Sequence, residues 1–333
     1  MTEAPARQVH PGSTGDPFVR SDAVPATRQA ASPAQLIPNG AGPQGGPVPA
    51  GAISVVTASG APAASRPLTA SAPSRTAAGA GWAGSPIHPR LDLGNGPLSD
   101  SRGRYTVELA RDAADLRAAQ RLRHEVFAGE MGARLDSPVS GLDVDRLDAY
   151  CDHLLVRSGD EVVGTYRMLA PGRSDRLYSE GEFDLSALRG IRGGLVEVGR
   201  TCVHPDHRGG AVIGLMWAGI ARYMVAGGFT WLGGCCSVPL ADGGTTAAGV
   251  LDQVGLGPER YRVTPRNPWT GEGVARPDRL VVPSLLRGYL RLGAWVCGAP
   301  AHDPEFGTAD FFVLLSLANV DTRYLRHFLG VAE

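Results

Sequence analysis

Residues 195–226 read LVEVGRTCVHPDHRGGAVIGLMWAGIARYMVA, and the fold class is read outward from this stretch. Leu195 to Val203 is rich in β-branched residues and predicts a buried strand, which His204-Pro205 ends. Gly210 to Ala226 predicts a helix, because apolar residues recur there at helical spacing. Its apolar face is formed by Ile213, Trp217, Ile220 and Met224.

The residues before this stretch predict a strand, a helix and a hairpin. YTVEL begins at Tyr105 and alternates as a strand does. Asp112 stands where an N-cap belongs, before a helix that Gly132 ends. The runs HLLVR and VVGTYRML are separated by Ser158-Gly159-Asp160, whose turn chemistry predicts a β-hairpin.

The residues after the stretch continue the alternation of strands and helices. Phe229 to Cys236 predicts a strand and Thr245 to Val254 a helix. VPSLLRGYLRLG predicts a further helix, and AWVCG and TADFFVLLS predict two further strands. This order predicts an α/β (α+β) fold in which an antiparallel hairpin joins a mixed central sheet with helices on its faces.

The first hundred residues differ in composition from the rest of the chain. More than half of the 26 prolines lie there, among long Ala/Gly/Ser stretches with few large apolar residues. Such a segment buries too little surface to offset its ordering entropy. We therefore expect residues 1–103 to form a disordered tail, in which 52–57 could be a short strand or a docking segment, and residues 104–333 to form one domain.

Composition excludes several classes of protein. The 32 basic residues, all arginine, nearly balance the 33 acidic ones, which argues against a nucleic-acid binder. No apolar run is long enough to span a bilayer, and the N-terminus lacks a secretory signal. The five cysteines form no Cys-x-x-Cys pair, so we expect a reduced, cytoplasmic protein with no metal site.

Charged residues stand at several positions where a folded core should be apolar. They are Arg123 with Phe127 one turn later, Asp145 with Asp148, Arg167 in the hairpin, and Glu197 with Arg200 in the central strand. Each has a structural explanation as a solvated helix residue, a turn residue or a buried salt bridge. Because side chains alternate along a strand, Glu197 and Arg200 share a face only if a β-bulge separates them.

The order of these charged residues resembles that of the acyl-homoserine-lactone autoinducer synthases, a GNAT-fold family. A longer set of blocks resembles the haemolysin-like N-acyltransferases, which include the enzyme that acylates ornithine from 3-hydroxyacyl carrier protein to give lyso-ornithine lipid. The blocks are CDHLLV (151–156), VVGTYRML (162–169), YSEGEFDL (178–185), EVGRTCVHPDHR (197–208), and LLRGYLRLGAWVCGAP with DPEFGTADFFVLL (285–315). The resemblance covers roughly residues 104–328 and implies a GNAT acyl-CoA N-acyltransferase-like fold.

The resemblance implies a role for each charged residue in aminolysis of a thioester. Glu197 is the expected general base, and Arg200 is grouped with it as catalytic. Asp145 and Asp148 are expected to hold the amines of the acceptor, and Arg167 or Arg200 its carboxylate. Arg123 and Phe127 complete the expected substrate site. Backbone N–H groups from Thr201 through Cys202 to Val203 are expected to meet the oxyanion and the donor's pantetheine, with Arg208 beside them.

The loop at 208–213 favours acyl carrier protein over coenzyme A as donor. It reads RGGAVI, so Ala211 and Ile213 occupy positions at which a pyrophosphate-binding loop needs small residues. We therefore expect an acyl carrier protein partner and no tightly bound cofactor. Acyl carrier proteins are acidic, so exposed arginines are expected to form the docking surface. The candidates are Arg173, Arg176, Arg189, Arg192 and Arg208.

Three alternatives remain at this point. An autoinducer synthase would bind S-adenosylmethionine, but no tryptophan stands near 130–134 as it does in that family. A conventional coenzyme A acetyltransferase would need a different 208–213 loop. A non-catalytic GNAT-like domain would serve as an interaction module. Because the product would be amphiphilic, contact with the inner face of the membrane is also considered, with helix 282–293 lying either at that interface or in the core.

Overall fold

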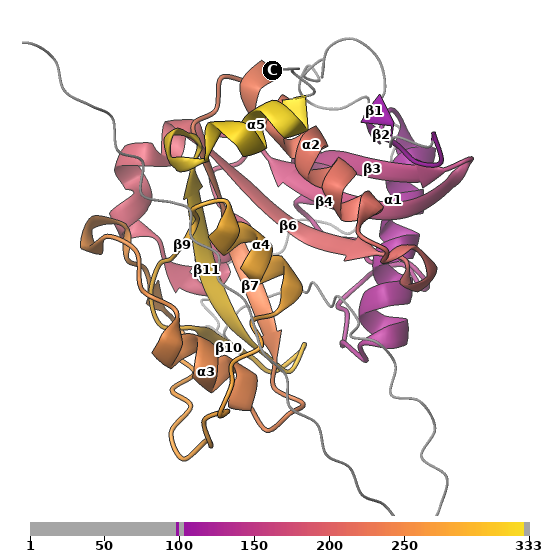
Figure 1. Cartoon of the computed structure of the whole chain (residues 1–333). Coiled ribbons are helices and arrows are strands. Elements are labelled where there is room, and N and C mark those ends of the chain that lie inside the picture. Colours follow the sequence, from indigo (N-terminus) through magenta and orange to yellow (C-terminus); the bar gives the residue numbers. More distant parts are fainter. Residues whose placement is uncertain (1–97, 100–102, 330–333) are drawn as a thin grey trace, which may run out of the picture. The chain divides into compact units, whose positions relative to one another are not determined.

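The computed structural model describes residues 98–99 and 103–329 (Figure 1). The segment at 52–57 and nearly all of the expected tail lie outside the described residues. The described part contains one central sheet with helices packed against it.

The central sheet has nine strands, and a separate pair of short strands forms a second sheet. The central strands are β1 (Leu98–Ser99), β2 (Thr106–Leu109), β3 (Asp152–Ser158), β4 (Glu161–Leu169), β6 (Leu195–Val203), β7 (Trp231–Pro239), β9 (Trp295–Val296), β10 (Ala301–Asp303) and β11 (Thr308–Ser316). The second sheet pairs β5 (Phe183–Asp184) with β8 (Thr264–Pro265).

The central sheet is mixed, as predicted. Its order is β1-β2-β3-β4-β6-β7-β11-β10, with β9 also paired to β11. All pairs are antiparallel except β6 with β7, which are parallel. The parallel pairing covers three residue pairs, from Leu195↔Trp231 to Glu197↔Gly233, although β6 continues to Val203 and β7 to Pro239.

Five α-helices and several short 3-10 or π segments connect the strands in the described residues. The α-helices are α1 (Ala113–His124), α2 (Ala211–Ala226), α3 (Thr245–Gln253), α4 (Ser284–Arg291) and α5 (Thr322–Leu329). A π-helical segment, η1 (Glu125–Glu130), extends α1. The 3-10 segments are η2 (Asp148–Tyr150), η3 (Tyr178–Gly181), η4 (Ser186–Gly194), η5 (Pro205–His207), η6 (Glu259–Tyr261) and η7 (Leu317–Asn319).

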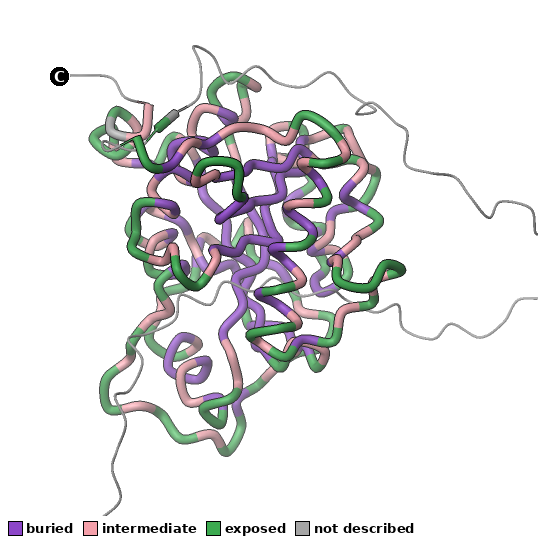
Figure 2. The backbone as a smooth tube through the Cα atoms, turned by 90° about the vertical axis from the view of Figure 1, so that its right-hand side faces the viewer, coloured by how far each residue is buried: buried purple, intermediate pink, exposed green. Residues whose placement is uncertain are grey.

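The helices divide between the two faces of the sheet. On one face, α2 packs on β2, β3, β4 and β6, and the apolar side chains of α2, α3 and α4 share one large core. Two glycines let α2 approach closely, because a Cβ at Gly164 would lie 2.7 Å from Val212 and one at Gly219 would lie 2.9 Å from Leu154. The same buried core runs through the centre of Figure 2.

The other face carries two smaller apolar clusters. One joins α1 and η1 to Leu155 and Cys202, and the other joins the segment 177–188 to Cys235 and Phe312. Of the charged residues named from the sequence, Arg167 lies on β4 and Glu197 and Arg200 lie on β6, while Arg123 lies on α1 and Asp145 and Asp148 lie before and in η2.

The local predictions compare closely with the structure. Asp112 caps α1, because its carboxylate accepts hydrogen bonds from the backbone N–H groups of Ala114 and Asp115 at 2.8 and 2.9 Å. The hairpin forms as β3 and β4. The predicted strand at 229–236 is displaced and runs over 231–239 instead. Strands β1, β5, β8 and β10 were not predicted, because two or three residues are too few to show an alternating pattern, and β1 lies within the expected tail.

Helix α4 is a core helix, as one of the two hypotheses predicted. Leu285, Leu286 and Tyr289 are buried in the large core, so the apolar side of α4 faces the protein. Among the described residues, no helix is both long enough and apolar enough to cross a membrane.

Candidate active site

A β-bulge brings Glu197 and Arg200 to the same face of β6. The register between β4 and β6 passes from Thr165↔Cys202 to Arg167↔Gly199, so two residues of β6 oppose one residue of β4. At this point Arg200 has a φ of +51°, in the left-handed region that non-glycine residues rarely adopt. The condition stated from the spacing, a β-bulge between Glu197 and Arg200, is thus met. Strain of this kind, of about 1–3 kcal/mol, is often found at functional sites.

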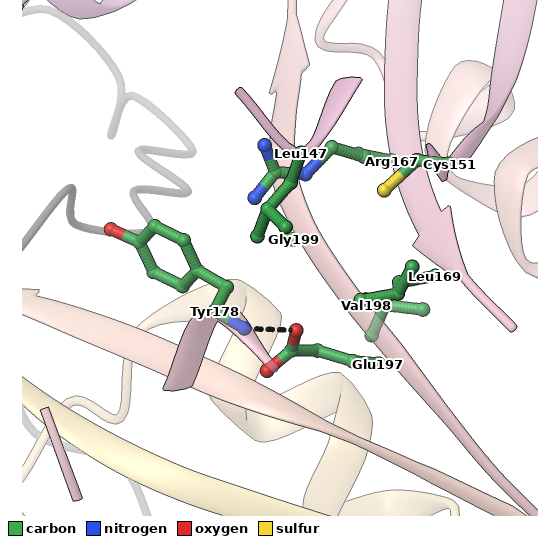
Figure 3. A pocket seen from close by; sticks show the side chains of 8 residues that line it. All are labelled: Leu147, Cys151, Arg167, Leu169, Tyr178, Glu197, Val198 and Gly199. Carbon is green, nitrogen blue, oxygen red and sulfur yellow. Dashed lines mark hydrogen bonds between the residues drawn. The ribbon is translucent and has the colours of Figure 1, made fainter. Parts of the chain in front are cut away.

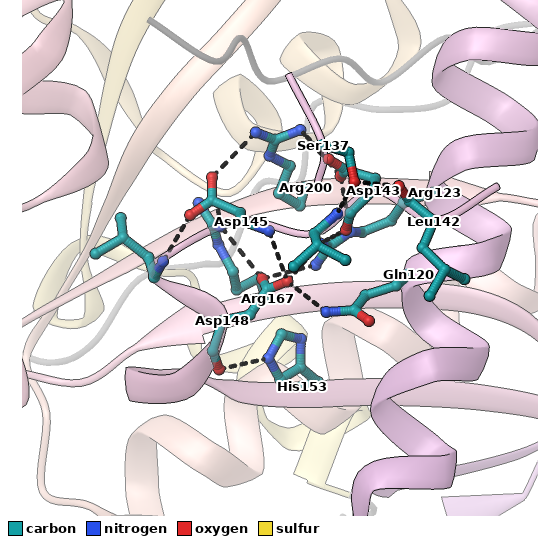
Figure 4. A network of polar contacts seen from close by, with 12 residues as sticks. Gln120, Arg123, Ser137, Leu142, Asp143, Asp145, Asp148, His153, Arg167 and Arg200 are labelled. Carbon is teal, nitrogen blue, oxygen red and sulfur yellow. Dashed lines mark hydrogen bonds and ion pairs between the residues drawn. The ribbon is translucent and has the colours of Figure 1, made fainter. Parts of the chain in front are cut away.

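Arg123 and Asp148 form the buried base of a charged network (Figure 4). Arg123 is fully buried, and its Nη2 lies 2.7 Å from Asp148 Oδ2. Gln120 donates a hydrogen bond to the same carboxylate at 2.9 Å, and the His153 ring contacts the Asp148 carbonyl oxygen at 3.0 Å. Burial acts to raise the pKa of Asp148, but Arg123 outweighs it and holds that pKa well below its ordinary value.

Two more arginines and two more aspartates complete this network. Arg200 Nη1 lies 2.9 Å from Asp143 Oδ2, and Arg200 Nη2 lies 3.1 Å from Asp145 Oδ2. Arg167 Nη1 lies 3.2 Å from Asp145 Oδ2. Burial would raise the pKa of Asp145, but Arg167 and then Arg200 lower it to about 2. With Arg123 and Asp148, the network contains three guanidinium and three carboxylate groups, so its charge is balanced.

Glu197 lies beside this network and outside its ion pairs. Its carboxylate accepts hydrogen bonds from the backbone N–H groups of Tyr178 at 2.6 Å and Ser179 at 2.8 Å. It is buried, and burial raises its pKa above the ordinary value of 4.5 despite these two hydrogen bonds. Glu197 therefore combines a fixed orientation with increased basicity.

Glu197 lines a small pocket at the centre of this face (Figure 3). The pocket residues are Leu147, Cys151, Arg167, Leu169, Tyr178, Glu197, Val198 and Gly199. The Tyr178 ring lies beneath both neighbouring guanidinium groups, with its centroid 5.3 Å from Arg167 Cζ and 5.7 Å from Arg200 Cζ. Cation–π attraction thus adds to the ion pairs that fix the two arginines.

The remaining predicted residues lie around this centre. Phe127 is buried, and its ring is edge-on to Phe306 at 6.1 Å. Cys202 is buried in the same apolar cluster. Arg208 lies beyond the end of β6, where it forms a salt bridge with Glu130 at 2.6 Å and donates a hydrogen bond to the Val203 carbonyl oxygen at 3.0 Å.

The structure also reveals residues that the sequence reasoning missed. Asp143 joins Arg123 to Arg200, yet only Asp145 and Asp148 had been selected from the same aspartate-rich loop. Its position two residues before Asp145 was an available signal. Tyr178 and Ser179 orient Glu197 through their backbone N–H groups. Because nearly every residue has a backbone N–H, the sequence does not indicate which of them act as donors.

Comparison with known proteins identifies a matching domain family and relatives of known name. Residues 122–218 match the family model of the acetyltransferase (GNAT) domain, which confirms the expected GNAT-like fold. The L-ornithine N(alpha)-acyltransferase of Rhodobacter capsulatus is 35% identical over 235 residues, which cover 63% of this chain and 89% of that protein. The L-ornithine N(alpha)-acyltransferase of Rhizobium meliloti is 34% identical over 262 residues, which cover 70% and 88%.

Solved structures are more distantly similar. An N-acyl amino acid synthase from uncultured soil microbes has a TM-score of 0.41 and 13% identity, with 67% of this chain and 98% of that chain covered. A CoA-dependent acyl-homoserine lactone synthase has a TM-score of 0.40 and 18% identity, with 66% and 82% covered.

Proposed function

The chain belongs to the L-ornithine N(alpha)-acyltransferase family and is an acyltransferase, and from this premise we propose that it acylates the α-amino group of ornithine. The observation that carries the proposal is the identity of 32–35% with four L-ornithine N(alpha)-acyltransferases, each covered over 88–93% of its length. We further propose that the acyl group is 3-hydroxylated, that the donor is acyl carrier protein, and that the product is lyso-ornithine lipid.

The proposed reaction is the aminolysis of a thioester. The α-amine must first lose a proton, because an ammonium has no lone pair. Its nitrogen then forms a bond to the acyl carbon, and the C–S bond breaks to release the pantetheine thiol. Since a thiol has an ordinary pKa near 8.5, the thiolate leaves readily and takes up a proton.

Glu197 is the proposed general base. A general base works best when its pKa approaches the operating pH, and burial shifts Glu197 in that direction. The hydrogen bonds from Tyr178 and Ser179 fix its carboxylate at the pocket. Glu197 would accept the ammonium proton directly or through one water molecule.

The edge of β6 beyond Glu197 is the proposed donor site. The pairing of β6 with β7 ends at Glu197, so the edge of β6 on the β7 side is not engaged in that ladder from there to Val203. Backbone N–H groups between Thr201 and Val203 would stabilise the oxyanion and bind the pantetheine amides. At Gly234, a Cβ would lie 2.2 Å from the Val198 carbonyl oxygen, so glycine is needed where the two strands begin to separate.

The contacts support a positioning role for Asp145 and Asp148, because arginines occupy both carboxylates. The expected role of these aspartates in holding acceptor amines gains no support from this arrangement. We propose instead that they orient Arg167 and Arg200, whose guanidinium groups lie over Tyr178 at the pocket. Either arginine would attract the acceptor's carboxylate, which a planar guanidinium group can bind with two hydrogen bonds.

Two of the five candidate arginines are better placed than the others to bind acyl carrier protein. Arg173, Arg192 and Arg208 each form an ion pair with a carboxylate of the chain. Arg176 and Arg189 are exposed, so they are better placed to meet an acidic partner. Contact with the inner face of a membrane remains part of the proposal because the product is amphiphilic, but the apolar side of α4 does not provide it.

The proposal is tested by incubating the purified protein with ornithine and either 3-hydroxyacyl carrier protein or the matching acyl-coenzyme A. Mass spectrometry should detect N-acylornithine, with turnover faster from the carrier protein. The Arg176→Ala and Arg189→Ala variants should raise KM for the carrier protein and leave KM for ornithine unchanged. Absence of N-acylornithine with both donors would refute the proposed activity, and faster turnover with coenzyme A would refute the donor assignment.

A further inference from the structure

A second group of acidic residues lies on the same face of the sheet, outside the charged network. Glu182, just before β5, Cys235 on β7 and Asp310 on β11 each place one side-chain atom so that all three lie within 4.8 Å of one another. All three residues are buried, with exposed fractions of 8%, 6% and 0%. Asp303 on β10 is buried nearby, and its charge contributes to the raised pKa of Glu182 and of Asp310. We call Glu182 and Asp310 the acid pair.

The acid pair lacks a cation. Within residues 98–99 and 103–329, neither carboxylate has an ion pair, in contrast to the balanced network beside it. Both carboxylate oxygens of Glu182 and one of Asp310 are buried without a hydrogen-bond partner. The other Asp310 oxygen accepts a hydrogen bond from Thr308 Oγ1 at 2.7 Å.

Two neutral hydroxyl groups also lie beside the acid pair. Ser237 is opposite Asp310 in the β7–β11 register and is 3% exposed; its hydroxyl makes no well-aligned hydrogen bond, but it is close enough to Asp310 to act to lower the pKa of that carboxyl. The Tyr178 hydroxyl is likewise buried and unbonded. Burial and then Glu182 raise the pKa of Tyr178, which shows that this hydroxyl lies in the field of the acid pair. Buried polar groups are nearly always paired in native proteins, so several weakly paired groups in one place point to interaction with a polar ligand.

The acid pair is connected to the proposed base through Tyr178 and Ser179. The Ser179 N–H donates to Glu197, and the Ser179 hydroxyl accepts a hydrogen bond from Cys235 Sγ at 3.2 Å. Tyr178 also donates its N–H to Glu197. Glu197 lies on β6, Cys235 on the neighbouring strand β7, and Asp310 on β11 beyond it, while Glu182 lies just before β5. Glu197 and the acid pair are thus linked through two residues, Ser179 and Cys235.

We infer that the acid pair binds the side-chain ammonium of the acceptor while the acceptor's α-amine is presented to Glu197. This inference rests on the proposed function, in which the acceptor is a diamino acid. An alkylammonium has three N–H donors and no acceptor, and the site offers carboxylate and hydroxyl acceptors with no competing cation. Burial raises the pKa of both carboxyl groups, and a cation bound between them would stabilise their ionised form.

This arrangement determines which amine reacts. The side-chain amine stays protonated between two carboxylates and cannot attack the thioester, because its lone pair is engaged with the proton. The α-amine lies at the other end of a chain of three methylene groups, beside a base. The acid pair would thus select acceptors with a cationic side chain and direct the acyl group to the α-nitrogen.

The test compares ornithine with norvaline, which has the same carbon skeleton and no side-chain amine. In the wild-type protein, kcat/KM should be higher for ornithine. The Glu182→Gln and Asp310→Asn variants should each lower kcat/KM for ornithine about tenfold or more, mainly through KM, because each removes a charge-assisted hydrogen bond. Both should leave kcat/KM for norvaline within about twofold. The Asp321→Asn variant, on a partly exposed aspartate far along the chain from the acid pair, is the matched control.

Thermal unfolding gives a second measurement that does not need turnover. Ornithine should raise the Tm of the wild-type protein and of the control, and should do so much less in the two acid-pair variants. An unchanged preference for ornithine in the variants would overturn the inference while the proposed function stands. A wild-type protein that acylates neither acceptor would instead refute the proposed function and with it the inference. If zinc chloride raises Tm, ornithine does not, and Glu182→Gln abolishes the zinc effect, the site binds a metal and the inference is wrong.

Discussion

The same chemical change should have opposite effects on stability in the two clusters of carboxylates. In the charged network, Asp148→Asn removes one of three negative charges that balance three arginines, and it turns an amide group toward donors from Gln120 and Arg123. Breaking a buried ion pair from one side costs about 3–5 kcal/mol. Since domains are typically stable by about 5–15 kcal/mol, this variant should lose a large part of its unfolding free energy.

In the acid pair, the change to an amide should stabilise the protein at neutral pH. Burial, with a smaller contribution from Asp303, raises the pKa of Asp310 from its ordinary 3.8 to about 6, although hydrogen bonds act to lower it. Each unit of pKa difference corresponds to about 1.4 kcal/mol, so the ionised carboxylate destabilises the fold by about 2–3 kcal/mol above pH 6. An asparagine is neutral at every pH and avoids this cost.

The dependence on pH gives the sign of the effect. Because the pKa is higher in the folded state, Asp310 favours folding below about pH 4, and this contribution is lost as the pH rises through about 6. The difference between Asp310→Asn and the wild type should therefore be small at pH 4 and reach its full value at pH 7. Asp148 should behave in the opposite way, since its pKa is lowered and its contribution is present at neutral pH.

Urea unfolding followed by circular dichroism measures both effects, with the m-value as a check on the two-state assumption. The control is Asp321→Asn, because Asp321 pairs with an exposed arginine and surface pairs contribute about 0–1 kcal/mol. A loss of less than about 1 kcal/mol in Asp148→Asn would refute the description of the network as a balanced, buried unit. A loss of stability at pH 7 in Asp310→Asn would show that another group of the chain compensates the charge of the acid pair.

Three further variants test the proposed site. Glu197→Gln should lower kcat by about 10²–10⁴-fold. The wild-type rate should rise with pH as a base with a pKa above 4.5 loses its proton, and this rise should disappear in the variant. Near-normal turnover would exclude Glu197 as the base. Gly234→Ala should lower the free energy of unfolding by at least about 1–3 kcal/mol, because its Cβ would lie 2.2 Å from the Val198 carbonyl oxygen. The control Gly255→Ala, with open space around the added Cβ, should be tolerated. Equal unfolding midpoints in the two variants would contradict the close approach of the strands. Arg200→Lys keeps the charge, but lysine lacks the planar fork that contacts both aspartate partners. The acceptor KM should therefore rise by a larger factor than the accompanying loss of thermal stability explains. An unchanged KM would confine Arg200 to a structural role.

The part of the fold that sequence predicted best was local. The Asp112 cap, the hairpin turn at 158–160 and the helix at 211–226 depend on residues close together in the chain, where turn and capping chemistry decide the conformation. The bulge at Arg200 was also predictable, because two charged residues at an odd spacing in a buried strand require one if they act together.

The acid pair was not predicted, although both of its residues lie in blocks that had been quoted for their resemblance. Glu182 and Asp310 are separated by more than a hundred residues, and they meet only because β7 and β11 pair across the sheet and the 177–188 segment folds over them. Sequence patterns indicate which side chains of a single helix or strand share a face. They do not report which side chains from distant elements share a site, or how many cations accompany a group of carboxylates.

The count of arginines on this face distinguishes the two clusters. Three carboxylates with three arginines are held in fixed positions and have no charge left to bind a ligand. Within the described residues, the acid pair has two carboxyl groups and no ion-paired arginine. Burial raises the pKa of both groups, so a cation from outside the chain would favour their ionised form. The near-neutral charge of the whole chain conceals this difference, since the excess negative charge is local, buried and next to the proposed base.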